Sequence, residues 1–81
     1  HHHPDHVGGA SAICAALGLP LRAHEATLAR LPGVPHGPPL SEGDREVVGG
    51  VAIDVLHVPG HAPGHLVFLE PSTRAMVVGD M

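Results

Sequence analysis

The first six residues of the chain, His-His-His-Pro-Asp-His, follow an H-x-H-x-D-H pattern whose side chains can bind metal ions. In an extended segment alternate side chains share a face, so His1 and His3 can converge on one ion. Asp5 and His6 stand at the expected start of a helix and can reach a second ion. Imidazole and carboxylate ligands suit zinc and also iron.

Two further motifs add ligands of the same kind. Residues 59–65 read Pro-Gly-His-Ala-Pro-Gly-His, in which two Pro-Gly pairs predict a tight loop and each pair precedes a histidine, His61 or His65. A rigid loop at the end of a strand can hold a ligand in fixed geometry. Near the end of the chain, Asp80 follows the apolar run 75–78, and a carboxylate at the end of a buried strand can bridge two cations.

Each motif also has a simpler explanation. The leading histidines are similar to a purification tag, the Pro-Gly loop to an ordinary turn with two surface histidines, and Gly79-Asp80 to a plain turn at a strand end. A tag does not usually continue as Pro-Asp-His into an amphipathic helix. The three motifs together are therefore more specific than any one of them.

Hydrophobic periodicity and turn residues predict the elements that position these side chains. Helices are expected at 7–17, ended by Gly18 and Pro20, and at 24–31, followed by a loop at 32–43. Strands are expected at 19–23, at 47–58 with a turn at Gly49-Gly50 inside it, at 65–69 and at 75–78, with a turn at 70–74 between the last two.

Composition limits the possible functions. The chain has 81 residues, enough for one domain at most, and a formal charge of −4 with only four basic residues, so its charge does not support binding to nucleic acid. Phe68 is the one aromatic residue, which leaves few surfaces for stacking bases. Cys14 is the one cysteine and is expected in the core. No apolar run approaches the ~20 residues of a membrane span, and a cytoplasmic location is the default expectation.

The chain resembles the metallo-β-lactamase superfamily over essentially all of its length. The resemblance rests on the H-x-H-x-D-H motif, the helix start at Gly8-Gly9, the loop at 59–65 and the strand that ends in Gly79-Asp80, in that order. It implies an α/β fold that is part of an αββα sandwich, with a mixed sheet and helices on one side. Residues 1–81 are then a fragment of a single domain, with its N-terminal strand and C-terminal part missing.

The same resemblance implies a role for each ligand. His1, His3 and His61 hold one metal ion, Asp5 and His6 belong to the second, and Asp80 bridges the two. The last ligand of the family, a histidine far downstream, lies beyond residue 81. The resemblance leaves the remaining histidines outside the ligand set: His65 supports the loop, and no role is expected for His2, His24, His36 and His57.

The activity implied by the resemblance is hydrolysis of an ester, thioester, amide or phosphodiester bond in a small-molecule substrate. Two zinc ions would lower the pKa of a shared water, and Asp5 is expected to orient the resulting hydroxide. His3 argues against the flavodiiron branch and His6 against the cysteine-ligand lactamases. Glyoxalase-II-like thioesterases, lactamase-like endoribonucleases and general bacterial hydrolases remain, and the last two groups are preferred.

Two alternatives stay open. The persulfide dioxygenases share the fold and motifs, hold one iron through residues matching His1, His61 and Asp80, and oxidise their substrate, so metal identity separates the two activities. In the other alternative the 81 residues bind metal without activity and expose a sheet face. The sequence leaves the oligomeric state open.

Overall fold

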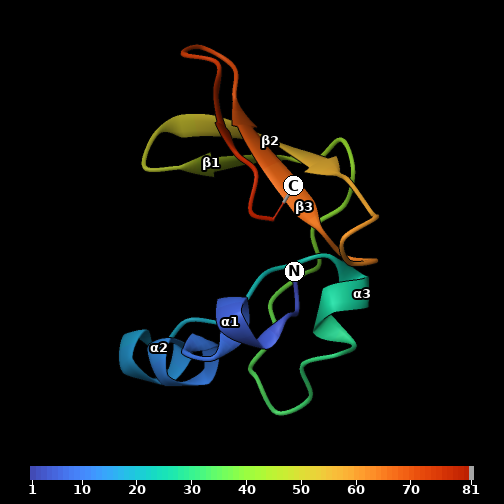
Figure 1. Cartoon of the computed structure of the whole chain (residues 1–81). Coiled ribbons are helices and arrows are strands. Elements are labelled where there is room, and N and C mark those ends of the chain that lie inside the picture. The colour runs from blue at the N-terminus through green and yellow to red at the C-terminus, as the bar shows by residue number, and fades with distance from the viewer. Residues whose placement is uncertain (81) are drawn as a thin grey trace.

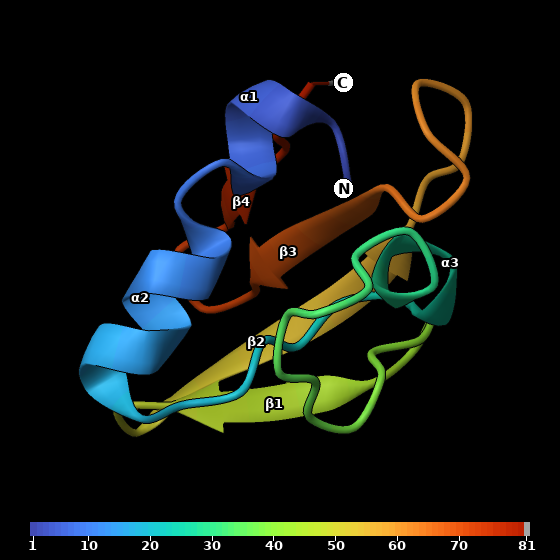
Figure 2. The same ribbon diagram turned by 90° about the horizontal axis from the view of Figure 1, so that it is seen from below.

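The computed structural model describes residues 1–80 and contains one four-stranded sheet with the strand order β1-β2-β3-β4. Figure 1 shows the three helices on one side of this sheet, and Figure 2 shows the same arrangement from below. The strands are β1 (Arg45–Val48), β2 (Val51–His57), β3 (Leu66–Glu70) and β4 (Ala75–Val77), and the helices are α1 (Pro4–Val7), α2 (Ala10–Leu17) and α3 (Glu25–Leu28).

The sheet is antiparallel throughout the described residues, where a mixed sheet was expected. Gly49 and Gly50 have φ values of +58° and +81°, which form the expected two-residue turn and pair Val48 with Val51. Consecutive strands joined by short connections must run antiparallel, because a parallel pair needs a crossover of a dozen residues or more. Within residues 1–80, the one parallel pairing is an isolated bridge between Leu21 and His36.

The predicted helix at 7–17 is two helices in the structure. Pro4 occupies the first turn of α1, where its missing N–H is not needed, and His3 precedes it in an extended conformation. α2 ends at Gly18, whose left-handed backbone (φ +65°) lets its N–H donate to the Cys14 carbonyl. The short α1 therefore keeps Asp5 and His6 next to the extended residues that precede it.

The second predicted helix and the strand before it are also shorter than expected. α3 begins after His24, whose Nδ1 accepts a hydrogen bond from the Ala26 amide at 3.1 Å. The predicted strand at 19–23 is reduced to the single bridge at Leu21. Pro20 lacks the N–H that a regular ladder of hydrogen bonds would need there.

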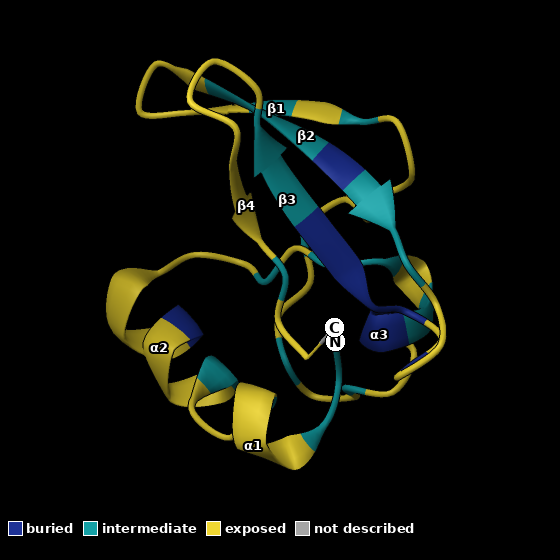
Figure 3. Cartoon of the chain, turned by 45° about the horizontal axis from the view of Figure 1, so that its top comes forward, coloured by how far each residue is buried: buried dark blue, intermediate teal, exposed yellow. Residues whose placement is uncertain are grey.

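A small core lies between the sheet and the loop that leads to β1. Val55 is fully buried and packs with Leu40 and Leu66, and Phe68 contacts this cluster. Figure 3 shows the buried residues concentrated on β2, β3 and α3, while the two edge strands are largely exposed. Val47 on β1, for example, is 70% exposed.

Two other expectations concern α2 and membranes. Cys14 is a buried free thiol on α2, as predicted for a core position. No helix formed by residues 1–80 has both the length and the hydropathy that crossing a bilayer requires.

The turn between β3 and β4 directs the chain back toward Asp80. The Glu70 carboxylate accepts hydrogen bonds from the hydroxyls and amides of Ser72 and Thr73. These bonds, led by the one from the Ser72 hydroxyl, lower the pKa of Glu70 to about 2. Glu70 therefore stays ionised in mild acid, and the turn keeps its hydrogen bonds.

α3 packs directly against the loop at 59–65. The Thr27 hydroxyl, which belongs to a residue only 2% exposed, donates to the Gly64 carbonyl at 3.1 Å. A Cβ atom on Gly64 would collide with the Thr27 hydroxyl and lie 2.7 Å from the Thr27 amide nitrogen. Glycine is thus required at position 64 because the two backbones approach so closely.

A Gly64→Ala substitution is expected to destabilise the intact protein by about 1–3 kcal/mol, because α3 must move away from the loop. The measurement is the midpoint of urea unfolding. Gly9→Ala is the matched control, since its Cβ would make an ordinary 3.7 Å contact with Ile13. Equal unfolding midpoints for the two variants would contradict the close packing described here.

Candidate metal centre

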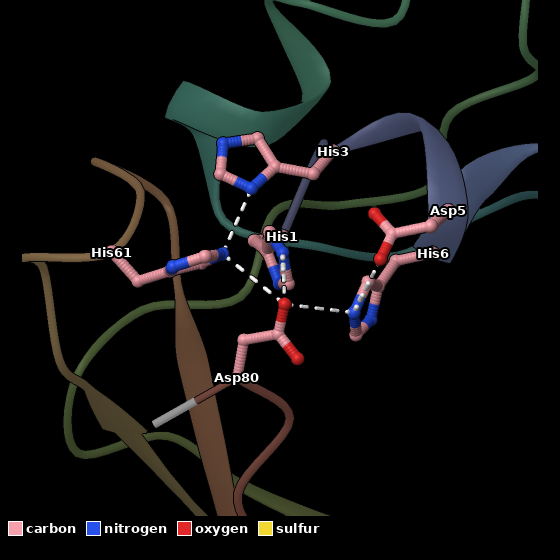
Figure 4. Close-up of polar contacts among 6 residues, drawn as sticks. All are labelled: His1, His3, Asp5, His6, His61 and Asp80. Carbon is pink, nitrogen blue, oxygen red and sulfur yellow. Dashed lines mark hydrogen bonds and ion pairs between the residues drawn. The ribbon is translucent and has the colours of Figure 1, made fainter.

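Five of the six predicted metal ligands meet at one place, although they come from separate parts of the chain (Figure 4). His1 and His3 lie in the extended residues before α1, and His6 lies in α1 itself. His61 comes from the loop between β2 and β3, and Asp80 follows β4. The antiparallel hairpins and the short α1 thus bring the two ends of the chain together.

The first group consists of His1, His3 and His61, whose ligand atoms all lie within 4.8 Å of one another. His3 Nδ1 is 2.8 Å from His61 Nε2, and the centroids of these two rings are 4.5 Å apart. The His1 ring lies 4.7 Å from each of the other two. These are the three residues expected to share one ion.

The second group consists of His1, His6 and Asp80, again with ligand atoms within 4.8 Å of one another. Asp80 Oδ2 is 3.1 Å from His6 Nε2, 3.2 Å from His61 Nε2 and 3.7 Å from His1 Nε2. One carboxylate oxygen therefore lies between the two groups, which is the position that a bridging ligand needs.

Asp5 lies outside both groups. Its carboxylate is 3.7 Å from His6 Nε2, and its side chain is 75% exposed. Asp5 and His6 are consecutive residues of α1, so their side chains leave the helix in different directions. The structure joins His6 with His1 and Asp80, whereas the resemblance paired His6 with Asp5.

The chemistry of these groups fits a metal ion. The His1 side chain is 1% exposed, and its Nε2 has no hydrogen-bond partner among residues 1–80. Leaving a buried polar atom unsatisfied costs about 1–3 kcal/mol, and several imidazole nitrogens and a carboxylate converge on the same space. A cation would satisfy all of them at once, and nitrogen and oxygen donors suit zinc or iron.

His65 lies close to the His1 ring and is not in either group. It is 1% exposed, its ring centroid is 5.2 Å from that of His1, and its ring nitrogens have no hydrogen-bond partner in the described part of the chain. A Cβ on Gly79 would lie 3.1 Å from His65 Nε2, and Gly79 has a φ of +58°. Glycine at 79 thus lets the chain pass close to the His65 ring and place the Asp80 carboxylate beside the histidines.

His24 and His57, for which no role was expected, form a stacked pair beside the loop at 59–65. Their ring centroids are 4.1 Å apart with an interplanar angle of 15°, and His57 Nε2 lies 2.7 Å from the Pro63 carbonyl oxygen. The sequence held a weak signal for both: His24 stands at a helix start, and His57 immediately precedes the loop. Neither signal indicated that the two rings would meet.

Comparison with known proteins gives the family to which the chain belongs. The family model described as the metallo-beta-lactamase superfamily matches residues 1–81. A hydroxyacylglutathione hydrolase from Fuscovulum blasticum is 39% identical over 80 residues, which cover 99% of this chain and 31% of that protein. One from Jannaschia sp. is 38% identical, with 99% and 30% covered. The chain spans about a third of the length of these relatives.

Two solved structures show the same fold. The crystal structure of TTHA1623 in a di-iron-bound form is 35% identical with a TM-score of 0.77, and the match covers 100% of this chain and 46% of that one. The MIM-2 metallo-beta-lactamase is 27% identical with a TM-score of 0.74, covering 84% and 32%. These likenesses confirm the predicted α/β class and partial sandwich. Because the family model spans the whole sequence, the chain belongs to the metallo-β-lactamase superfamily.

Proposed function

We propose that this chain forms the metal-binding part of a hydrolase that uses two zinc ions to cleave a thioester of a small-molecule substrate. The observation that carries the proposal is the convergence of His1, His3 and His61 on one point, with Asp80 between them and His6. Membership of the superfamily supports a metal-dependent hydrolase. Residues 1–81 would belong to a single domain, since the family model spans them.

The relatives favour a thioester as the bond that is cleaved. Those compared above are named hydroxyacylglutathione hydrolases, and a hydroxyacylglutathione is a thioester of glutathione. They belong to the glyoxalase-II-like branch, so the preference for endoribonucleases or general hydrolases finds no support among them. We therefore propose a hydroxyacylglutathione or a related thioester as the substrate.

The proposed ligands follow the two groups seen in the structure. His1, His3 and His61 would hold one ion, His6 would serve the second, and Asp80 would bridge them. Asp5 is proposed to complete the second ion's ligands, because its exposed carboxylate lies 3.7 Å from His6 and is free to change rotamer.

In the proposed hydrolysis, the metal ions and the side chains around them would have separate roles. When bound, the metal ions supply a water of lowered pKa and polarise the scissile carbonyl. Asp5 would accept a hydrogen bond from the attacking water and orient it toward the carbonyl carbon. His65 and Gly79 would fix the backbone that presents Asp80.

A mononuclear iron site is the second candidate. His1 Nε2 and His61 Nε2 lie 3.7 and 3.2 Å from Asp80 Oδ2, so two histidines and one carboxylate stand together as in many non-haem iron oxygenases. This set supports the persulfide dioxygenase alternative, in which the substrate is oxidised. The TTHA1623 structure shows that a related fold can hold iron.

Metal content tests the assignment of His61. The intact protein, purified without a metal-affinity column, is expected to carry about two zinc ions per chain by mass spectrometry. His61→Ala should lose at least one of them, because three ligands become two. His36→Ala is the control, since His36 belongs to neither group of candidate ligands and its Nε2 lies 3.1 Å from the Leu31 carbonyl oxygen.

Equal zinc in His61→Ala and the parent protein would contradict the proposed centre, because the leading histidines would then be chelating without the loop. Bound iron together with oxygen uptake would show that the protein is a dioxygenase and not a hydrolase.

Activity tests the role of Asp5. The zinc-loaded intact protein should hydrolyse a hydroxyacylglutathione, and Asp5→Asn should lower kcat/KM by about 10²–10⁴-fold, the usual contribution of a residue that guides proton transfer. Glu25→Gln, at an exposed position of α3, is the control and should leave the rate unchanged. A parent protein that binds zinc but leaves the thioester intact would refute the substrate, and an Asp5→Asn variant of full activity would refute the role.

A further inference from the structure

We propose that His57, stacked on His24, is a positioning residue that fixes the loop carrying His61 and so sets the geometry of the metal centre. The inference rests on the proposed function, in which His61 is a metal ligand. His57 is the last residue of β2 and belongs to neither group of candidate ligands.

The hydrogen bond of His57 shows which nitrogen of its ring carries the hydrogen. His57 Nε2 is 2.7 Å from the Pro63 carbonyl oxygen, and a carbonyl can only accept, so Nε2 carries the hydrogen and donates it. This bond joins the end of β2 to the far side of the loop, two residues beyond His61.

His24 holds the His57 ring in the orientation that this bond requires. The two rings stack with centroids 4.1 Å apart and an angle of 15°. The His24 ring is itself fixed, because its Nδ1 accepts a hydrogen bond from the Ala26 amide at the start of α3. Rotating the His57 ring away from Pro63 would therefore also break its stacking contact with His24, the residue just before α3.

A second contact secures the next residue of the loop. The Thr27 hydroxyl of α3 donates to the Gly64 carbonyl at 3.1 Å. Two consecutive carbonyls of the loop therefore accept hydrogen bonds, that of Pro63 from His57 on β2 and that of Gly64 from Thr27 on α3. At the base of the loop, the Val58 amide donates to the His65 carbonyl at 2.9 Å. The loop is thus attached at its base and on two sides.

His61 extends from this attached loop into the metal centre. Its Nε2 is 2.8 Å from His3 Nδ1 and 3.2 Å from Asp80 Oδ2, which are the distances between the candidate ligands themselves. Losing the bond to Pro63 would let the loop shift, and the third histidine of the first group would be displaced. Partners that orient metal ligands typically change metal affinity by 10–100-fold when removed.

Two variants of the intact protein separate the hydrogen bond from the stacking. His57→Phe keeps a ring against His24 but has no donor, whereas His57→Gln keeps an N–H donor. We expect zinc affinity, measured by competition with a chromophoric chelator, to fall about 10–100-fold in His57→Phe and to recover at least partly in His57→Gln. His36→Phe is the control and should bind zinc as the parent does.

Two further readouts exclude a merely structural effect. The visible spectrum of the cobalt-substituted protein should change in His57→Phe, because the coordination geometry changes, while the urea midpoint stays near that of the parent. In the metal-free protein, amide hydrogen exchange at Val58 and His65 should be several-fold faster in His57→Phe than in His57→Gln.

The outcomes distinguish this inference from the proposed function. A parent protein that binds no metal would refute the function, while the exchange rates of the metal-free variants would still test whether His57 holds the loop. Equal zinc affinity and equal exchange in His57→Phe and the parent would overturn the inference. Equal losses in both variants would also overturn it, because glutamine keeps the donor.

Discussion

The contact on which the rest of the structure depends is that of the Asp80 carboxylate with the imidazoles of His1, His6 and His61. It joins the two ends of an 81-residue chain around a histidine that is almost fully buried. Of the atoms in this cluster, His1 Nε2 is buried without a hydrogen-bond partner among residues 1–80, which is unusual for a buried polar atom. The cluster has the composition of a set of metal ligands, and a cation shared by these side chains would stabilise the arrangement.

The elements around the centre serve to place these few atoms. The sheet carries the His61 loop at the end of β2 and returns the chain through β4 to Asp80, while the short α1 presents His6 beside His1. Glycine is required at 64, where a Cβ would collide with Thr27, and is favoured at 79 by a φ of +58° and by the His65 ring 3.1 Å from a Cβ placed there. The small core around Val55 supports this arrangement but is too small to determine it alone.

Much of this could be predicted from the sequence, because the information is local. The motifs predicted five of the residues that meet at the candidate centre, Gly49-Gly50 predicted a hairpin turn, and Cys14 was correctly placed in the core. Features that depend on tertiary packing were missed. The direction of the Asp5 side chain follows from where α1 begins, and the pairing of His24 with His57 depends on α3 meeting the end of β2.

The most direct test of the centre is anomalous diffraction at the zinc edge from crystals of the zinc-loaded intact protein. We expect one ion about 2.0–2.1 Å from ring nitrogens of His1, His3 and His61, and a second beside His6 with the Asp80 carboxylate between them. An ion held by the leading histidines with His61 turned away would contradict this expectation.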